Sequence, residues 1–154
     1  MDVYAKLKEL NIELPAAPAK GGAYTSVKVF GGNLVYVSGC GPQVNGTCPT
    51  GKLGREIDIE TGKLCARNSM LNVLAAVEKE IGDLNRIADV VKVLCFVSSV
   101  DDFTQQPAVA NGATLLLAEL FGEKAGLPTR SAIGVNVLPG DIPVEIEAIF
   151  ELKA

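Results

Sequence analysis

The sequence predicts an α+β domain in which one sheet carries both long helices on the same face. Strand-like segments alternate with two segments of helical periodicity in the order β-β-α-β-α-β-β. A chain of 154 residues has the size of one domain with a substantial core. Hydrophobic residues make up 48% and charged residues 21%, which is typical of an ordinary globular protein.

Residues 1–19 are predicted to form a helix followed by a loop. Leu7, Leu10 and Leu14 recur on one helical face, and a proline ends the helix. The segment lacks the basic-then-apolar order of a signal peptide, and no apolar run reaches the ~20 residues of a membrane span. We therefore expect a cytoplasmic protein with one domain over residues 1–154, in which residues 1–19 are an extension.

Two strands and a long loop are expected next. Apolar runs at 24–30 and 33–39 flank the turn signal Gly31–Gly32, which predicts a hairpin. Residues 40–62 are rich in glycine and other turn residues, which predicts a loop. Loops of this length often carry function, so the segment is of functional interest.

The rest of the chain is predicted to form two helices and three strands. Apolar residues recur at helical spacing over 65–81 and over about 107–121, and a glycine follows each run. Segments rich in Val or with alternating polarity, at 87–100, 130–137 and 142–152, are typical of strands.

The strand predicted at 87–100 is apolar on both faces. One face carries Val91, Val93, Cys95 and Val97, and the other carries Val90, Leu94 and Phe96. Two helices can cover only one face of the sheet. We therefore expect the other face to be buried against further copies of this chain.

The composition excludes several kinds of chemistry. The chain has no histidine, which excludes histidine-based triads and histidine general bases. The spacing of the four cysteines matches no zinc signature, so we expect no metal, and no basic residue beside Cys40 would lower its pKa. A net charge of −4 without a basic stripe argues against nucleic-acid binding.

Arg130 is the one charge in the small-residue segment "RSAIGVNV". In an antiparallel hairpin around "LPGD", Arg130 would share a face with Glu145, roughly 13 Å away at ~3.3 Å per residue. The small residues Ala132 and Gly134 would lie between them. Arginine binds a carboxylate through two parallel hydrogen bonds, and glutamate can activate a water or pass a proton. Arg130 either belongs to a pocket for a small carboxylate or forms a structural salt bridge with Glu145, Glu147 or an acidic residue of a neighbouring subunit.

Three segments together resemble one known family. "PTRSAIGVNVLPGDIPVEIEAI" has an Arg-Ser pair opening a strand, a Leu-Pro turn and a following V-E-I-E-A strand. "GGAYTSVKVFGGNLVYVSGCGPQ" has a Tyr before the first strand and a Ser-Gly at the end of the second. "NVLAAVEKEIGDLNRIADVVKVLCFVSSVDDF" adds a helix, a Val-rich strand and an Asp-Phe turn. Over about residues 20–152, the chain resembles the Rid (YjgF-type) family of imine deaminases.

This resemblance implies a chorismate-mutase-like fold assembled as a homotrimer with clefts between subunits. It implies hydrolysis of 2-imino acids, or their enamine tautomers, to 2-keto acids and ammonia, without a metal or organic cofactor. Arg130 would bind the carboxylate of the substrate, and Glu145 would act on the attacking water. The site would also be lined by Tyr24, Gly39, Asn111 and Ala132.

Three features separate the chain from many members of the family. Many deaminases have Cys at the position of Ala132 and Glu near Gly134, the loop at 40–62 is longer here, and the N-terminal helix is an addition. These departures leave open a non-catalytic module that binds a small carboxylic acid. A third interpretation, an endoribonuclease or translation inhibitor, is disfavoured by the net charge of −4.

Overall fold

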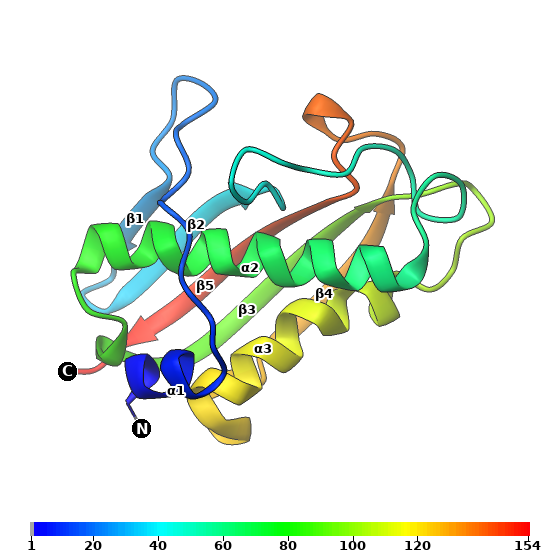
Figure 1. The fold of residues 1–154 in the computed structure, drawn as a ribbon. Helices are drawn as coiled ribbons and strands as arrows, with labels where there is room; N and C mark the ends of the chain where they lie inside the picture. The colour runs from blue at the N-terminus through cyan, green and yellow to red at the C-terminus, as the bar shows by residue number, and fades with distance from the viewer. Residues whose placement is uncertain (1) are drawn as a thin grey trace.

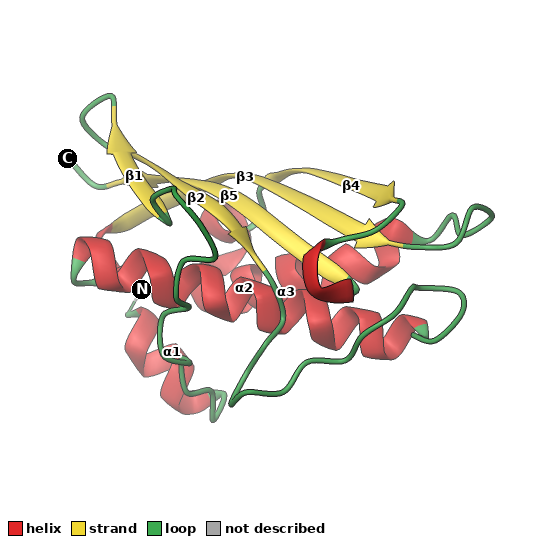
Figure 2. Cartoon of the chain, turned by 90° about the horizontal axis from the view of Figure 1, so that it is seen from above, coloured by secondary structure: helices red, strands yellow, loops and turns green. Residues whose placement is uncertain are grey.

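A five-stranded sheet and two long helices form the main layers of the computed structural model, which describes residues 2–154 (Figure 1). The strands are β1 (Val27–Phe30), β2 (Leu34–Cys40), β3 (Ile87–Ser98), β4 (Thr129–Val135) and β5 (Val144–Leu152). Their spatial order is β1-β2-β5-β3-β4, and every neighbouring pair is antiparallel except β3 and β4. Both long helices lie on one face of the sheet (Figure 2), which confirms the predicted α+β class.

Both long helices extend beyond the predicted bounds. Helix α2 (Ile59–Ile81) begins early because the side chain of Asp58 accepts a hydrogen bond from the backbone N–H of Thr61 and caps the first turn. It ends at Gly82, whose φ of 83° lies in the left-handed region. Helix α3 (Gln106–Gly126) carries a break at Gly122. The loop before α2 is therefore shorter than predicted and covers residues 41–58.

The N-terminal extension forms a short helix, α1 (Val3–Glu9), on the side of the helical layer away from the sheet (Figure 2). The side chain of Asp2 caps its first turn, and the backbone N–H of Val3 donates to Oδ1 of Asn85 at 2.8 Å. Leu7 is buried. Among residues 2–154, no helix is both long enough and apolar enough to cross a membrane.

The alternation of β3 is interrupted by a β-bulge. Val90 is paired with Phe150 and Lys92 with Ile149, so Val91 is an extra residue in β3. As a result Val90 faces the helices and is buried, whereas Val91 is 37% exposed. The prediction that Val91 shares the face of Val93 is wrong for this reason.

No helix of the described residues covers the face of the sheet opposite α2 and α3 (Figure 2). This face carries partly exposed apolar side chains. Phe30, Tyr36 and Ile133 are each between 42% and 44% exposed. Leu94 and Phe96 lie in the middle of this face and are partly buried. Burial of this face in an oligomer stays a prediction.

Candidate active site

Arg130 in β4 points toward α3. It is paired with Val93, which is buried against the helical layer, so Arg130 lies on the helix-covered face of the sheet. Its Nη1 donates to Oδ1 of Asn111 at 2.7 Å and to Oγ1 of Thr114 at 3.2 Å. These two acceptors lie one turn apart on α3, which therefore fixes one nitrogen of the guanidinium. Arg130, Asn111 and Thr114 form what we call the Arg130 half-site.

Most of the Arg130 guanidinium is available to a ligand. A guanidinium has five N–H donors on three nitrogens. Within residues 2–154, Nη1 alone makes hydrogen bonds, and Arg130 forms no ion pair. The alternative of a structural salt bridge with Glu145 or Glu147 is therefore not realised within one chain. The remaining donors can bind a carboxylate in the bidentate manner that arginine favours.

Glu145 in β5 lies on the opposite face of the sheet. It is paired with Phe96, whose neighbour Cys95 points into the core. A Cβ atom at Gly39 of β2 would overlap with the Glu145 carboxylate, so the carboxylate rests directly against the backbone of β2. Partial burial, and then the charge of Glu147, raise the pKa of the Glu145 carboxyl. A raised pKa brings this carboxyl closer to the range in which a group both accepts and donates protons.

The predicted placement of Arg130 and Glu145 on one face is wrong within a single chain. That prediction assumed a hairpin of the last two strands, but β3 lies between β4 and β5. The "LPGD" segment contains a short 3-10 turn at Pro139–Asp141 on a longer connection. Each chain thus presents two separate half-sites.

The predicted site residues divide between these half-sites. Asn111 contacts Arg130, and Ala132 lies two residues further along β4 on the same face. Gly39 and Tyr24 line one pocket next to Glu145, and the three residues form what we call the Glu145 half-site. At Gly134, a Cβ atom would lie 2.9 Å from the Nε2 of Gln106, so a side chain there would have to displace Gln106.

A pocket of about 740 Å³, which we call the side pocket, opens beside Gly39. One side is formed by residues 15–24 of the N-terminal segment, including Tyr24. The other side is formed by residues 39–50, at the end of β2 and in the loop before α2. Tyr24 is held in place by its hydroxyl oxygen, which accepts a hydrogen bond from the backbone N–H of Gly21 at 3.1 Å.

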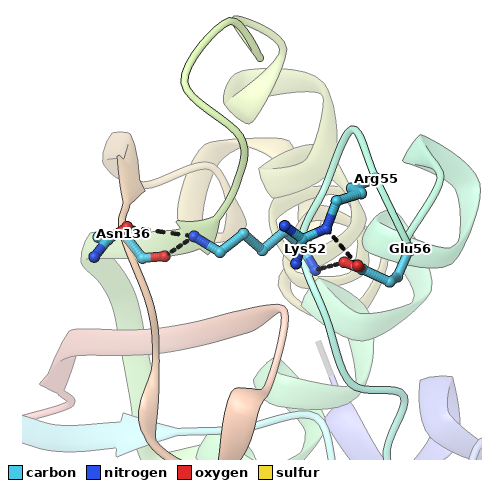
Figure 3. A network of polar contacts seen from close by, with 4 residues as sticks. All are labelled: Lys52, Arg55, Glu56 and Asn136. Carbon is cyan, nitrogen blue, oxygen red and sulfur yellow. Dashed lines mark hydrogen bonds and ion pairs between the residues drawn. The ribbon is translucent and has the colours of Figure 1, made fainter.

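The loop before α2 is anchored at several points. The side-chain amide of Asn72 on α2 donates to the carbonyl oxygens of Gly41 and Gln43, both at 2.8 Å. Lys52 donates to both the backbone carbonyl and the side-chain oxygen of Asn136 beyond β4 (Figure 3). The carboxylate of Glu56 accepts from the backbone N–H of Lys52 at 3.0 Å and pairs with Arg55 (Figure 3).

The cysteines show no sign of an activated thiolate. Burial, together with the charge of Glu145, raises the pKa of the Cys40 thiol in the side pocket to about 12. Burial also raises the pKa of Cys48. No group of three His, Cys, Asp or Glu residues within 2–154 is arranged to hold a metal ion.

Thr114 and Asn72 are two contributors that the sequence reasoning missed. Thr114 is only 6% exposed, and Asn72 only 3%. Thr114 lies inside an otherwise apolar stripe of α3 and follows Asn111 by one turn, and Asn72 lies inside the mostly apolar buried stripe of α2. A buried polar side chain requires a hydrogen-bond partner, and this requirement was the available signal.

Comparison with known proteins identifies the family. The model of the family described as "Endoribonuclease L-PSP" matches residues 14–152. The chain belongs to this family. Protein TCP17 of Trypanosoma cruzi is 42% identical over 98% of this chain and 94% of its own length. The 2-iminobutanoate/2-iminopropanoate deaminase of Dermatophagoides farinae is 33% identical over 92% of this chain and 95% of its own. These relatives confirm the resemblance to the Rid (YjgF-type) proteins.

Solved structures of similar proteins share the fold of this chain. Atu1372 from Agrobacterium tumefaciens is 38% identical, with a TM-score of 0.90 over 98% of this chain and 92% of its own. E. coli TdcF with bound serine is 28% identical, with a TM-score of 0.63 over 90% of this chain and 94% of its own. Because the match to Atu1372 covers 98% of this chain, it must include most of the N-terminal helix α1. Relative to Atu1372, this helix is therefore not an addition.

Proposed function

We propose that this protein hydrolyses 2-imino acids, or their enamine tautomers, to 2-keto acids and ammonia. The observation that carries the proposal is the Arg130 guanidinium, which α3 holds by one nitrogen while its other donors remain available for a carboxylate. The similarity to a protein named as a 2-iminobutanoate/2-iminopropanoate deaminase supports the reaction, and the serine bound to TdcF supports a small carboxylate ligand.

The proposed reaction needs only water as co-reactant. Arg130 binds the carboxylate and orients the imine carbon toward the water. Glu145 accepts a proton from the water as the water oxygen bonds to the carbon of the protonated imine and the C=N π electrons move to nitrogen, which gives a neutral carbinolamine. Glu145 then returns this proton to the nitrogen. The C–N bond breaks and ammonia leaves as the carbinolamine hydroxyl gives its proton to Glu145 and the C=O bond forms, and the ammonia finally takes up this proton as ammonium. The raised pKa of Glu145 suits a group that must both take and return a proton.

A complete site requires more than one copy of the chain under this proposal. The two half-sites lie on opposite faces of the sheet, so the Arg130 half-site of one copy would meet the Glu145 half-site of another. The uncovered apolar face around Phe96 and Ile133 offers the surface for association. In line with the family resemblance, we expect a homotrimer.

The proposal is tested by hydrolysis of 2-iminobutanoate generated in situ by an amino-acid dehydratase, with semicarbazide trapping the remaining imine. The wild type should accelerate loss of the imine, and Arg130→Ala should abolish the acceleration. Arg67→Ala is the matched control, because Arg67 lies on α2 and, within residues 2–154, pairs with Glu119 alone. Absence of acceleration by the wild type would contradict the proposal.

A binding module for small carboxylic acids is the second candidate, because the same Arg130 donors would hold a ligand that is not turned over. Glu145→Gln separates the two functions. An enzyme should lose turnover in this variant while still binding 2-oxobutanoate, as measured by calorimetry. A wild type that binds 2-oxobutanoate but hydrolyses no imine would favour the binding module.

A further inference from the structure

We infer that the side pocket receives the side chain of the substrate and that the protein prefers 2-imino acids with a large apolar side chain, of about the size found in leucine. The inference rests on the proposed function, in which Arg130 holds the carboxylate. A volume of about 740 Å³ lies in the range of pockets that enclose whole small-molecule ligands. An isobutyl group fits within this volume and buries more hydrocarbon there than the ethyl group of 2-iminobutanoate does.

The lining of the side pocket suits an apolar group. None of its lining residues is Lys, Arg, Asp or Glu, so the pocket offers no partner for a second charged group. The N-terminal segment contributes Pro15, Ala16, Pro18 and Ala19 to the lining. Ile142 lines the opposite side. Recognition of charge and recognition of the side chain would therefore be divided between Arg130 and the side pocket.

Several polar groups of the side pocket are already occupied. The amide nitrogen of Asn72 is used by the carbonyl oxygens of Gly41 and Gln43. The hydroxyl of Ser38 donates to the carbonyl oxygen of Thr25 at 2.8 Å. Groups that are paired within the protein do not need a polar ligand, so these parts of the lining tolerate an apolar side chain, beside the uncharged polar residues Ser26, Asn45 and Thr50 that also line the pocket.

The side pocket adjoins the reacting centre. Gly39 lines the pocket and also lies against the carboxylate of Glu145. A substrate whose imine carbon meets the water held by Glu145 would therefore have its side chain next to the pocket entrance. This continuity makes the substrate, rather than a separate ligand, the occupant that the structure favours.

The wall formed by the loop before α2 is fixed before any ligand binds. Asn72 holds its first part, and Lys52, just beyond its last part, is attached to Asn136 (Figure 3). The backbone N–H of Leu53 donates to the carbonyl oxygen of Ser98 at 2.8 Å and continues the attachment to β3. A preformed wall reduces the entropy cost of ordering the loop on binding. The free energy gained by burying the substrate side chain should therefore appear in the measured binding affinity.

The first experiment compares binding of two 2-keto acids, the products of the proposed reaction, by calorimetry. 4-Methyl-2-oxopentanoate has an isobutyl side chain, and 2-oxobutanoate has an ethyl group. Two additional buried carbons should make the larger acid bind about tenfold more tightly. Equal affinities, or tighter binding of the smaller acid, would overturn the inference.

The second experiment fills the side pocket. Ala19 lines the pocket and is exposed, so Ala19→Phe should reduce the preference for the larger keto acid to within about twofold without disturbing the core. Ala23→Phe is the matched control, because Ala23 is also exposed and does not line the pocket. A preference that survives Ala19→Phe, or that Ala23→Phe removes equally, would overturn the inference.

Turnover of the corresponding imines, measured in parallel, separates this inference from the proposed function. Tighter binding of the larger keto acid without hydrolysis of any imine supports the side pocket and contradicts the deaminase function. Hydrolysis without preference for the larger imine or keto acid supports the deaminase function and overturns the side-pocket inference. Absence of both binding and hydrolysis contradicts both.

Discussion

Glu145 is a carboxyl whose environment opposes its own ionisation. It is partly buried, it lies against the backbone of Gly39, and its nearest charged influence is the carboxylate of Glu147. The hydroxyl of Tyr36 donates a hydrogen bond to the carboxylate of Glu147 at 2.8 Å. The two glutamates of β5 therefore have different surroundings, because Glu147 is bound by a tyrosine hydroxyl, whereas burial and the charge of Glu147 raise the pKa of Glu145.

We expect Glu145→Gln to stabilise the protein at neutral pH. The pKa of Glu145 in the folded state lies above its unfolded value of about 4.3. At a pH between these two pKa values, the folded chain therefore binds more protons than the unfolded chain. Stability should therefore fall as the pH rises through this window and remain lower above it. Glutamine removes this penalty, so the Tm of the variant should exceed that of the wild type at pH 7, and the two should converge near pH 3.

Thermal unfolding from pH 3 to pH 8 tests this expectation. Glu80→Gln is the control, because it removes a charge from an exposed position on α2. A Glu145→Gln variant that is less stable than the wild type by the same amount at every pH would contradict the raised pKa.

Thr114 is expected to act on the substrate through Arg130. Thr114→Val keeps the shape of the side chain but removes the hydroxyl that accepts from Nη1 of Arg130. With Asn111 still in place, KM should rise about fivefold, or about 1 kcal/mol, while kcat stays within about twofold. Thr114→Ser should restore KM. Steady-state kinetics with 2-iminobutanoate would contradict this role if serine failed to rescue, or if kcat fell while KM did not change.

At the level of elements, the pattern of each strand was predictable and the pairing of strands was not. Period-two alternation assigns the faces of β5, where Ile146 is buried and Glu145 is not. It does not say which strand is the neighbour. The β3-α3-β4 unit is a crossover that places β4 parallel to β3, and this rule outweighs the hairpin signal of "LPGD". The β-bulge at Val91 could not be predicted for the same reason, because it is defined by the pairing of β3 with β5.

The candidate site residues can be selected from the sequence, but their arrangement in the fold cannot. Arg130 is conspicuous because a charge on a small-residue strand needs a partner, and Glu145 lies in a strand of alternating polarity. Their relation depends on the strand order, which the sequence pattern does not contain. The long loop before α2 was predictable from its glycines, whereas its attachment through Asn72 depends on tertiary contacts.

Asn72 should matter for the loop more than for the rest of the fold. Asn72→Ala removes the donor for two carbonyl oxygens and should lower the free energy of unfolding by about 1–3 kcal/mol. Amide hydrogen exchange should rise mainly within residues 41–51, because the contacts of Lys52 remain. Asn68→Ala is the control, since Asn68 lies one turn earlier and makes no side-chain hydrogen bond among the described residues. Faster exchange spread evenly over the whole chain would contradict a local anchoring role.

For the whole molecule, the distribution of the half-sites sets a requirement on assembly. Arg130 faces the helical layer and Glu145 faces the uncovered side of the sheet, with β3 between their strands. If both act on one substrate, the copies must be arranged so that these surfaces meet. We expect light scattering to give a mass about three times 16.1 kDa, and Phe96→Asp, on the uncovered face, to lower it.

Mixed assemblies of two inactive variants test whether different chains share one site. Arg130→Ala keeps Glu145, and Glu145→Gln keeps Arg130, so a site formed between one chain of each kind can hold both groups. After refolding at equal amounts, random assembly gives both groups in about one quarter of the sites, so imine hydrolysis should recover to about one quarter of the wild-type rate. Each variant refolded alone should stay inactive. If both groups came from the same chain, no mixture could recover activity, because every chain would lack one of them.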